Sequence, residues 1–174
     1  RRVGRRAAPA ADRRGALRRM SKNMTQENFI LNVHASAPGL TERSIGVART
    51  RAGATSYEAF CDFAKPGEGM SVVDLACGNG PLTELLVRRV GAGGRVSAVD
   101  LSEAELNSAR VRLARCPGVQ FLNEAATHLS LPSETADLIV CHMAFMLFTP
   151  LGAAVEELAR VLKHGGKFAA VIPT

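Results

Sequence analysis

The chain of 174 residues has the length of a single domain, and its 47% of hydrophobic residues is enough to form a buried core. No apolar run approaches the length of a membrane-spanning helix, so a membrane partner is not expected. The net charge of +6 comes from residues 1–20, where eight Arg and one Asp give +7, whereas the other 154 residues hold 14 basic and 15 acidic groups and carry −1. Because that remainder has no basic face, a nucleic-acid partner is not expected either.

The first 54 residues divide into two segments. Residues 1–23 are rich in Arg and Ala without an apolar stripe, which favours a disordered tail over a nucleic-acid arm or a targeting segment. Residues 24–54 combine a short helical pattern with glycines, and we expect an N-terminal helical or lid segment there; residues 55–174 then form the main domain. The four cysteines are far apart, and no secretory leader stands in front of them, so we expect a reducing cytoplasm.

The most informative stretch runs from residue 70 to residue 83. Residues 72–75 form an apolar run that is typical of a buried strand, and a glycine-containing turn follows at 76–80. Pro81 suits the first turn of a helix, whose free N–H groups attract an anionic or carboxylate-bearing ligand. The two glycines of the turn let the backbone approach a ligand closely. This pattern predicts a ligand site at the carboxyl end of a parallel strand.

The rest of the chain alternates strands with helices, and two capping boxes mark helix starts, at Thr55 with Glu58 and at Ser102 with Glu105. In chain order we expect a helix from 55 to about 65, a strand at 72–75, a helix at 81–90, a strand at 95–100, a helix from 102 to about 115, strands at 119–122 and 137–142, a last helix, and a strand at 167–172. This alternation predicts an α/β fold with a doubly wound, mostly parallel sheet.

The last helix has its own start and stop signals. We expect Thr149 at its N-cap, Pro150 at its first position and residues 163–166 at its end. The apolar residues expected on its inward face are Leu151, Val155, Leu158 and Leu162.

The sequence Asp74-Leu75-Ala76-Cys77-Gly78-Asn79-Gly80 closely resembles the first motif of the class I S-adenosylmethionine-dependent methyltransferases. Further segments match that family in order and spacing, at 100–101, 124–125, 137–140 and 158–167, so the resemblance covers roughly residues 55–173. It implies the Rossmann-like methyltransferase fold and the cofactor S-adenosyl-L-methionine, with S-adenosyl-L-homocysteine as product. It also implies methyl transfer by in-line displacement to a small-molecule acceptor, a metabolite or natural product.

Two aspartates are the main candidate binding residues. Asp100 ends a strand 20 residues beyond Gly80, where its two oxygens suit the vicinal hydroxyls of a ribose; this alone fits NAD as well as S-adenosylmethionine. Thr83 stands where the dinucleotide pattern has glycine, which favours the methyl donor. The resemblance implies that Asp74 orients the amino-acid end of the donor. The full set of expected cofactor-binding residues is Asp74, Ala76, Cys77, Gly78, Gly80, Asp100, Leu101, Glu124, Ala125 and Cys141.

His142 is the candidate catalytic residue. It stands at the carboxyl end of the strand at 137–142. As a neutral imidazole it suits the removal of a proton from a hydroxyl or amine of the acceptor; the alternative is a residue that only lines the pocket. No metal site is expected.

Members of the resembled family close the sheet with a β-hairpin after the fifth strand. This sequence stops at Thr174, so we expect a sheet that lacks the hairpin: either the chain is a fragment, or something else covers the fifth strand. Because an exposed apolar edge invites pairing, we expect self-association, as in a homodimer, through the edge of the fifth strand or through the N-terminal segment. Two other functions stay open: a non-catalytic or truncated S-adenosylmethionine-binding domain, and an NAD-dependent oxidoreductase.

Overall fold

The computed structural model describes residues 26–173, so the predicted tail of residues 1–23 lies outside the described residues. Within that range no helix combines the length and the apolar character needed to cross a membrane. The elements are α2 (Gln26–Ser36), α3 (Leu40–Ile45), α4 (Ser56–Ala64), β1 (Ser71–Leu75), α5 (Pro81–Val90), β2 (Arg95–Asp100), α6 (Glu103–Arg112), β3 (Val119–Asn123), β4 (Ala136–His142), the 3-10 turn η1 (Phe145–Leu147), α7 (Leu151–Val161) and β5 (Leu162–Val171).

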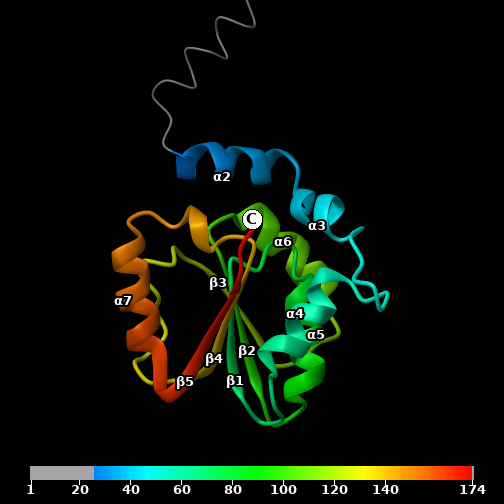
Figure 1. Cartoon of the computed structure of the whole chain (residues 1–174). Helices are drawn as coiled ribbons and strands as arrows, with labels where there is room; N and C mark the ends of the chain where they lie inside the picture. Colours follow the sequence, from blue (N-terminus) through cyan, green and yellow to red (C-terminus); the bar gives the residue numbers. More distant parts are fainter. Residues whose placement is uncertain (1–25, 174) are drawn as a thin grey trace, which may run out of the picture.

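The five strands form one sheet in the order β3-β2-β1-β4-β5, and every neighbouring pair is parallel. The chain therefore builds outward from β1 to β3, returns, and builds outward on the other side through β4 and β5 (Figure 1). The predicted doubly wound, parallel α/β fold is confirmed. In such sheets the point where the strand order reverses, here between β1 and β4, opens a crevice at the carboxyl ends.

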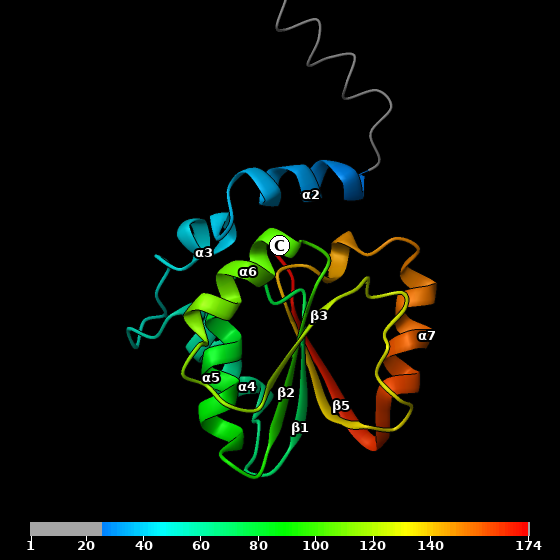
Figure 2. The ribbon, with the colours of Figure 1, turned by 180° about the vertical axis from the view of Figure 1, so that it is seen from behind.

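Helices cover both faces of the sheet, as Figures 1 and 2 show from opposite sides. Successive strand residues point to opposite faces, so Val72 of β1 packs with α4 and α5, whereas Val73 packs with α7. Helix α6 lies on the same face as α5, through Leu106 against Ala98 of β2. The N-terminal helix α2 crosses the end of the molecule at which the strands finish.

The predicted start and inward face of the last helix were partly wrong. Pro150 is the N-cap in an extended conformation, so the helix begins at Leu151, one residue later than expected. Leu158 is buried as predicted, but Leu151 and Val155 are 46% and 48% exposed. The helix instead buries Ala154 and Val161 beside Leu158, because the stripe at spacings of three and four also runs through these smaller residues.

Two further local predictions need correction. Residues 163–166 do not end a helix: β5 begins at Leu162, which pairs with Ala136, and a register shift follows before Leu138 pairs with Lys167. The second capping box is only half formed. The Ser102 hydroxyl accepts the N–H of Glu105, but the Glu105 side chain points to other partners, described below. The first capping box, at Thr55 and Glu58, is complete.

Candidate functional site

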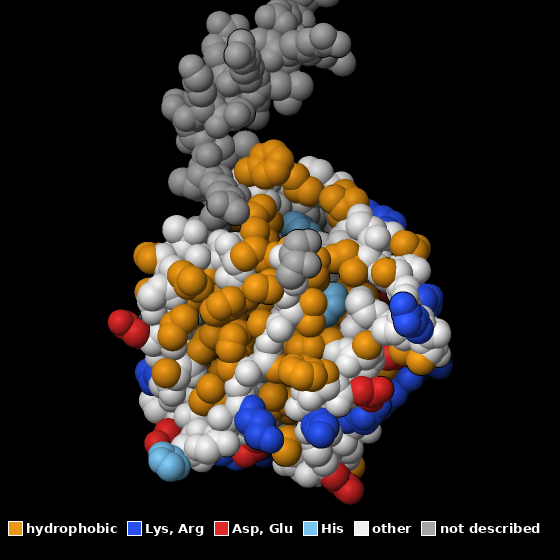
Figure 3. Space-filling view, in the orientation of Figure 1, with side chains coloured by type: hydrophobic (Ala, Val, Ile, Leu, Met, Phe, Trp, Pro, Cys, Tyr) orange, Lys and Arg blue, Asp and Glu red, His pale blue; other side chains and the backbone are white. Residues whose placement is uncertain are grey.

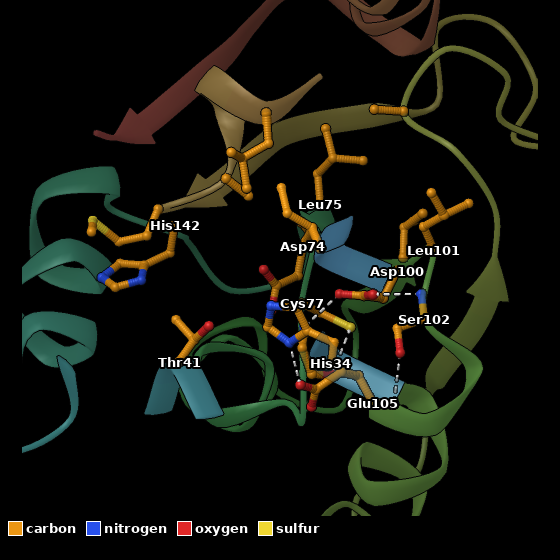
Figure 4. Close-up of a pocket in the computed structure, with 18 of the residues that line it drawn as sticks. His34, Thr41, Asp74, Leu75, Cys77, Asp100, Leu101, Ser102, Glu105 and His142 are labelled. Carbon is orange, nitrogen blue, oxygen red and sulfur yellow. Dashed lines mark hydrogen bonds and ion pairs between the residues drawn. The ribbon is translucent and has the colours of Figure 1, made fainter. Parts of the chain in front are cut away.

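A cavity lies at the carboxyl ends of β1, β2 and β4, where the strand order reverses. Its empty space measures about 1200 Å³, including the part open to solvent. The floor consists of residues that follow the strands, and the N-terminal helices α2 and α3 supply the opposite wall (Figure 4). The cavity occupies the point at which open α/β sheets bind their ligands, so it is a candidate cofactor or substrate site.

Asp74 is a buried acidic group of the cavity. It is 1% exposed, and its Oδ2 accepts a hydrogen bond of 2.6 Å from the hydroxyl of Thr83 in α5. Burial raises the pKa of Asp74 to about 7, and the Thr83 hydroxyl opposes that rise because it stabilises the ionised form. A cationic ligand group beside Asp74 would relieve the cost of ionising it.

Asp100 joins the end of β2 to the glycine turn. Its Oδ2 accepts the N–H of Gly78 and its Oδ1 accepts the N–H of Ser102, each at 2.8 Å. Burial raises the pKa of Asp100, and the two backbone N–H groups oppose that rise. A carboxylate has about four acceptor positions, so two remain for a ligand such as a pair of vicinal hydroxyls.

The turn itself is open toward the cavity. Gly78 has a φ of +54°, and a Cβ placed there would meet no other atom within 4 Å, so the space above its backbone is free for a ligand. Two non-glycine residues that line the cavity, Ala76 and Met143, also have positive φ values, of 58° and 62°. Such strained residues cluster at functional sites, where the surrounding structure holds them.

His142 forms another part of the cavity wall, on the opposite side of Asp74 from Asp100 in the view of Figure 4. It is 7% exposed, its ring packs on Tyr57 at a centroid distance of 4.5 Å, and its Nε2 has no hydrogen-bond partner among the described residues. Burial lowers its pKa to about 4, so the imidazole is neutral at pH 7. An unpaired buried nitrogen is costly and is therefore a site where a ligand hydroxyl gains a partner.

Most of the residues expected from the sequence meet in this one cavity. The structure brings together Asp74, Ala76, Cys77, Gly78, Asp100, Leu101, Glu124, Ala125 and His142.

Gly80 and Cys141 are not among the lining residues. Gly80 has a φ of +83° and packs against α6, where a Cβ would approach Leu113 to 3.1 Å. Cys141 is fully buried in the core cluster beneath α7. Glu124 lines the cavity, although one oxygen of its carboxylate accepts the N–H of Ser130 at 2.9 Å.

Sequence reasoning missed the residues that reach the cavity from outside the strand ends. His34, Gly39 and Thr41 come from the N-terminal segment, and Glu105 comes from α6 (Figure 4). The sequence marks Thr83 only as a residue that replaces the glycine of the dinucleotide pattern, whereas in the structure its hydroxyl donates to Asp74. The partly buried His34–Glu105 contact spans 71 residues of sequence, and no local pattern signals it.

Comparison with known proteins identifies the class. Residues 72–166 match the family model described as "Methyltransferase domain", which is more than half of the chain. The chain therefore belongs to the methyltransferase-domain family.

Named relatives and a solved structure agree with that membership. The chain is 33% identical over 108 residues to a 2-phytyl-1,4-naphtoquinone methyltransferase of Thermosynechococcus vestitus, covering 62% of this chain and 48% of the relative. It is 36% identical over 102 residues to the ubiquinone/menaquinone biosynthesis C-methyltransferase UbiE of Hydrogenovibrio crunogenus, covering 57% and 40%. A SAM-dependent methyltransferase from Aquifex aeolicus superimposes with a TM-score of 0.58 at 29% identity, covering 62% and 58%. The chain spans less than half the length of these two named relatives.

The hydrogen bond from Thr83 to Asp74 leads to a prediction about the pKa of the Asp74 carboxyl group. Thr83→Val keeps the side-chain shape but removes the donor, so the pKa of Asp74 should rise above its value of about 7. Because the pKa in the folded protein exceeds the unfolded value of about 3.9, Asp74 lowers stability as pH rises from about 4 to about 7. In Thr83→Val this loss should extend to higher pH. Carboxyl-carbon NMR titration measures the pKa.

The control for that titration is Thr135→Val, since the Thr135 hydroxyl is exposed and donates to Pro132 instead. An unchanged Asp74 pKa in Thr83→Val would show that the hydroxyl does not stabilise the ionised carboxylate.

Proposed function

We propose that this chain binds S-adenosyl-L-methionine in the cavity and transfers the methyl group to a small-molecule acceptor, releasing S-adenosyl-L-homocysteine. The observation that carries the proposal is the pair of carboxylates at the carboxyl ends of neighbouring strands. Asp74 lies at the end of β1 and Asp100 at the end of β2, with the open glycine turn between them in the chain. Membership of the methyltransferase-domain family supports it.

The residues present fit this donor. The two free acceptor positions of Asp100 suit the ribose hydroxyls, and the open backbone at Gly78 suits a close approach of the amino-acid end. Asp74, beneath the turn, suits a positively charged ammonium group. When bound, the sulfonium centre supplies an electrophilic methyl group, so the protein has mainly to position the reactants and exclude water.

For the acceptor we propose a hydroxylated aromatic ring. The relatives named above are naphthoquinone and ubiquinone/menaquinone methyltransferases, which suggests a quinone-type ring in its reduced, hydroxylated form. Apolar and aromatic side chains also line the cavity, among them Leu147, Phe148 and Tyr57, whose ring packs on His142. The neutral Nε2 of His142 would accept the proton of a ring hydroxyl, which leaves electron density on the ring carbon that takes the methyl group. That carbon would then lose its own proton to solvent, which restores the aromatic ring, and His142 would return its proton to the ring oxygen.

The two alternative functions predict different observations. An NAD-dependent oxidoreductase is not favoured, because Thr83 occupies the glycine position of the dinucleotide pattern with a buried side chain that donates to Asp74. A non-catalytic donor-binding domain would bind S-adenosyl-L-homocysteine without methylating any acceptor.

The four free cysteines support a reducing cytoplasmic location.

We also propose that two copies of the chain associate through the apolar surface beside β5. β5 is an edge strand of the sheet, and Leu151, Val155, Phe168 and Ile172 are 46%, 48%, 37% and 54% exposed. Figure 3 shows hydrophobic side chains gathered over β5 and α7 on this face. An edge strand beside exposed apolar side chains is prone to pair with another chain.

The donor site is tested by calorimetric titration with S-adenosyl-L-homocysteine. Asp100→Asn loses the charge that strengthens hydrogen bonds to two hydroxyls, so affinity should fall about 100-fold. Asp62→Asn, an exposed carboxylate on α4 that pairs with Arg89, should bind like the wild type. Failure of the wild-type protein to bind would overturn the donor assignment.

The acceptor site is tested with reduced 2-methyl-1,4-naphthoquinone and S-adenosyl-L-methionine, with the methylated product followed by mass spectrometry. His142→Gln should lower kcat by about 100-fold or more, as expected for a lost general base, without changing donor affinity. Because the pKa of His142 is about 4, the wild-type rate should not fall through His142 protonation above pH 6. His128→Gln, in an exposed loop, is the control. Equal rates for both variants would exclude the base role, and no methylated ring would exclude this acceptor class.

The proposed dimer is tested by light scattering at micromolar concentration. Wild-type protein should have the mass of two chains, and Val155→Glu should have the mass of one, because a charge buried in an apolar interface is costly. Val111→Glu, at a 79% exposed position on α6, should leave the dimer intact. A single-chain mass for the wild type would rule out this association.

A further inference from the structure

The carboxylate of Glu105 is buried beneath the N-terminal segment. It belongs to the first turn of α6 and is 1% exposed. Both of its oxygens accept the N–H of Gly39 at 2.9 Å, and Oε1 lies 2.6 Å from Nδ1 of His34. A buried carboxylate is costly unless hydrogen bonds and an opposite charge compensate it. Within residues 26–173, the hydrogen bonds that the Glu105 carboxylate accepts come from one segment, residues 34–39.

The same segment forms a wall of the donor cavity. His34, Gly39 and Thr41 line it together with Gly78 and Asp100. Figure 4 shows the His34–Glu105 contact beside the Asp100–Ser102 hydrogen bond. Residues that hold the segment in place therefore also shape the site in which the donor is proposed to bind.

A second contact ties the segment to the glycine turn. The side-chain amide of Asn79 donates to Glu42 of α3 at 2.6 Å, and Arg112 of α6 pairs with the same carboxylate. Gly39, with a φ of +72°, is packed so closely against the turn that a Cβ there would lie 2.8 Å from Nδ2 of Asn79. Displacing the segment would thus disturb the turn, and a ligand on the turn would meet the segment.

We propose that Glu105 is a positioning residue for the donor site, which holds residues 26–45 closed over the cavity through His34 and Gly39. Closure and donor binding then strengthen each other, because the closed segment completes the wall and keeps water out. We call Glu105, His34 and Gly39 the Glu105 latch. The coupling to the donor rests on the proposed function, whereas closure itself is a property of the chain without a ligand.

The Glu105 latch predicts that closure of residues 26–45 weakens as pH rises. The charged groups that face His34 are Glu105 of α6 and Asp100 at the end of β2. The hydrogen bond to Glu105 raises the pKa of His34, so the ion pair is complete below the ordinary histidine pKa and weakens as pH rises through the raised value. Asp74 has the opposite effect on donor binding. It ionises as pH rises through about 7, and the ionised carboxylate favours a cationic donor.

The first test uses the full chain without ligand. Hydrogen exchange of the amides of residues 28–45 should become about tenfold faster in Glu105→Gln and in His34→Gln, as expected for the loss of a charge-assisted hydrogen bond. The matched controls are Glu103→Gln, an exposed carboxylate on the same helix, and His164→Gln, an exposed histidine at the start of β5. Both should exchange like the wild type. If Glu105→Gln does not fold, the partly exposed His34 position decides the result. Unchanged exchange in His34→Gln overturns the latch.

The second test measures S-adenosyl-L-homocysteine binding between pH 6 and pH 9. His34→Gln should bind about tenfold more weakly than wild type at pH 6, and the ratio of the two affinities should approach one at high pH. A ratio that does not change with pH would mean that His34 only fills space, which contradicts the proposal. If wild-type protein does not bind, the donor assignment fails, and the exchange experiment still decides whether the latch exists.

Discussion

The burial of the Asp74 carboxylate in a central strand is the constraint on which the rest of the site depends. β1 is paired on both sides, with Asp74 opposite Ala98 of β2 and Val140 of β4, and the Asp74 side chain is almost fully buried. The charge must therefore be met inside the protein, and Thr83 of α5 meets it on one side. The free side faces the cavity. Strand, turn and helix are thus fixed relative to one another before any ligand enters.

Much of this arrangement could be predicted from the sequence because its signals are local. The helix at Pro81–Val90 and the strand at Arg95–Asp100 have the predicted bounds, since proline, glycine and apolar periodicity mark both ends. The face of α7 was less predictable. Its sequence contains two overlapping apolar stripes, and in the folded chain the stripe with Ala154 and Val161 is the buried one.

The parts of the site that the sequence did not reveal are those set by tertiary contact. Ser102 and Glu105 have the spacing of a capping box, yet the Glu105 carboxylate turns away from the helix end to Gly39 and His34. The two uses of a glutamate at this position look identical in sequence. Gly80 was expected to contact the ligand, but its positive φ and its packing on α6 are what require glycine there. A glycine needed for packing and a glycine needed for ligand contact look the same in the sequence.

The charges of the cavity bear on the choice between the two cofactors considered from the sequence. Asp74, Asp100 and Glu105 all line it, and burial raises the pKa of both aspartates, so ionising them costs free energy in the free protein. A ligand with a sulfonium and an ammonium group recovers that cost, and its binding is linked to ionisation of Asp74. A dinucleotide would instead place a negatively charged pyrophosphate over the glycine turn, close to Asp74, where like charges repel. The burial of these carboxylates therefore supports the proposed methyl donor over a dinucleotide.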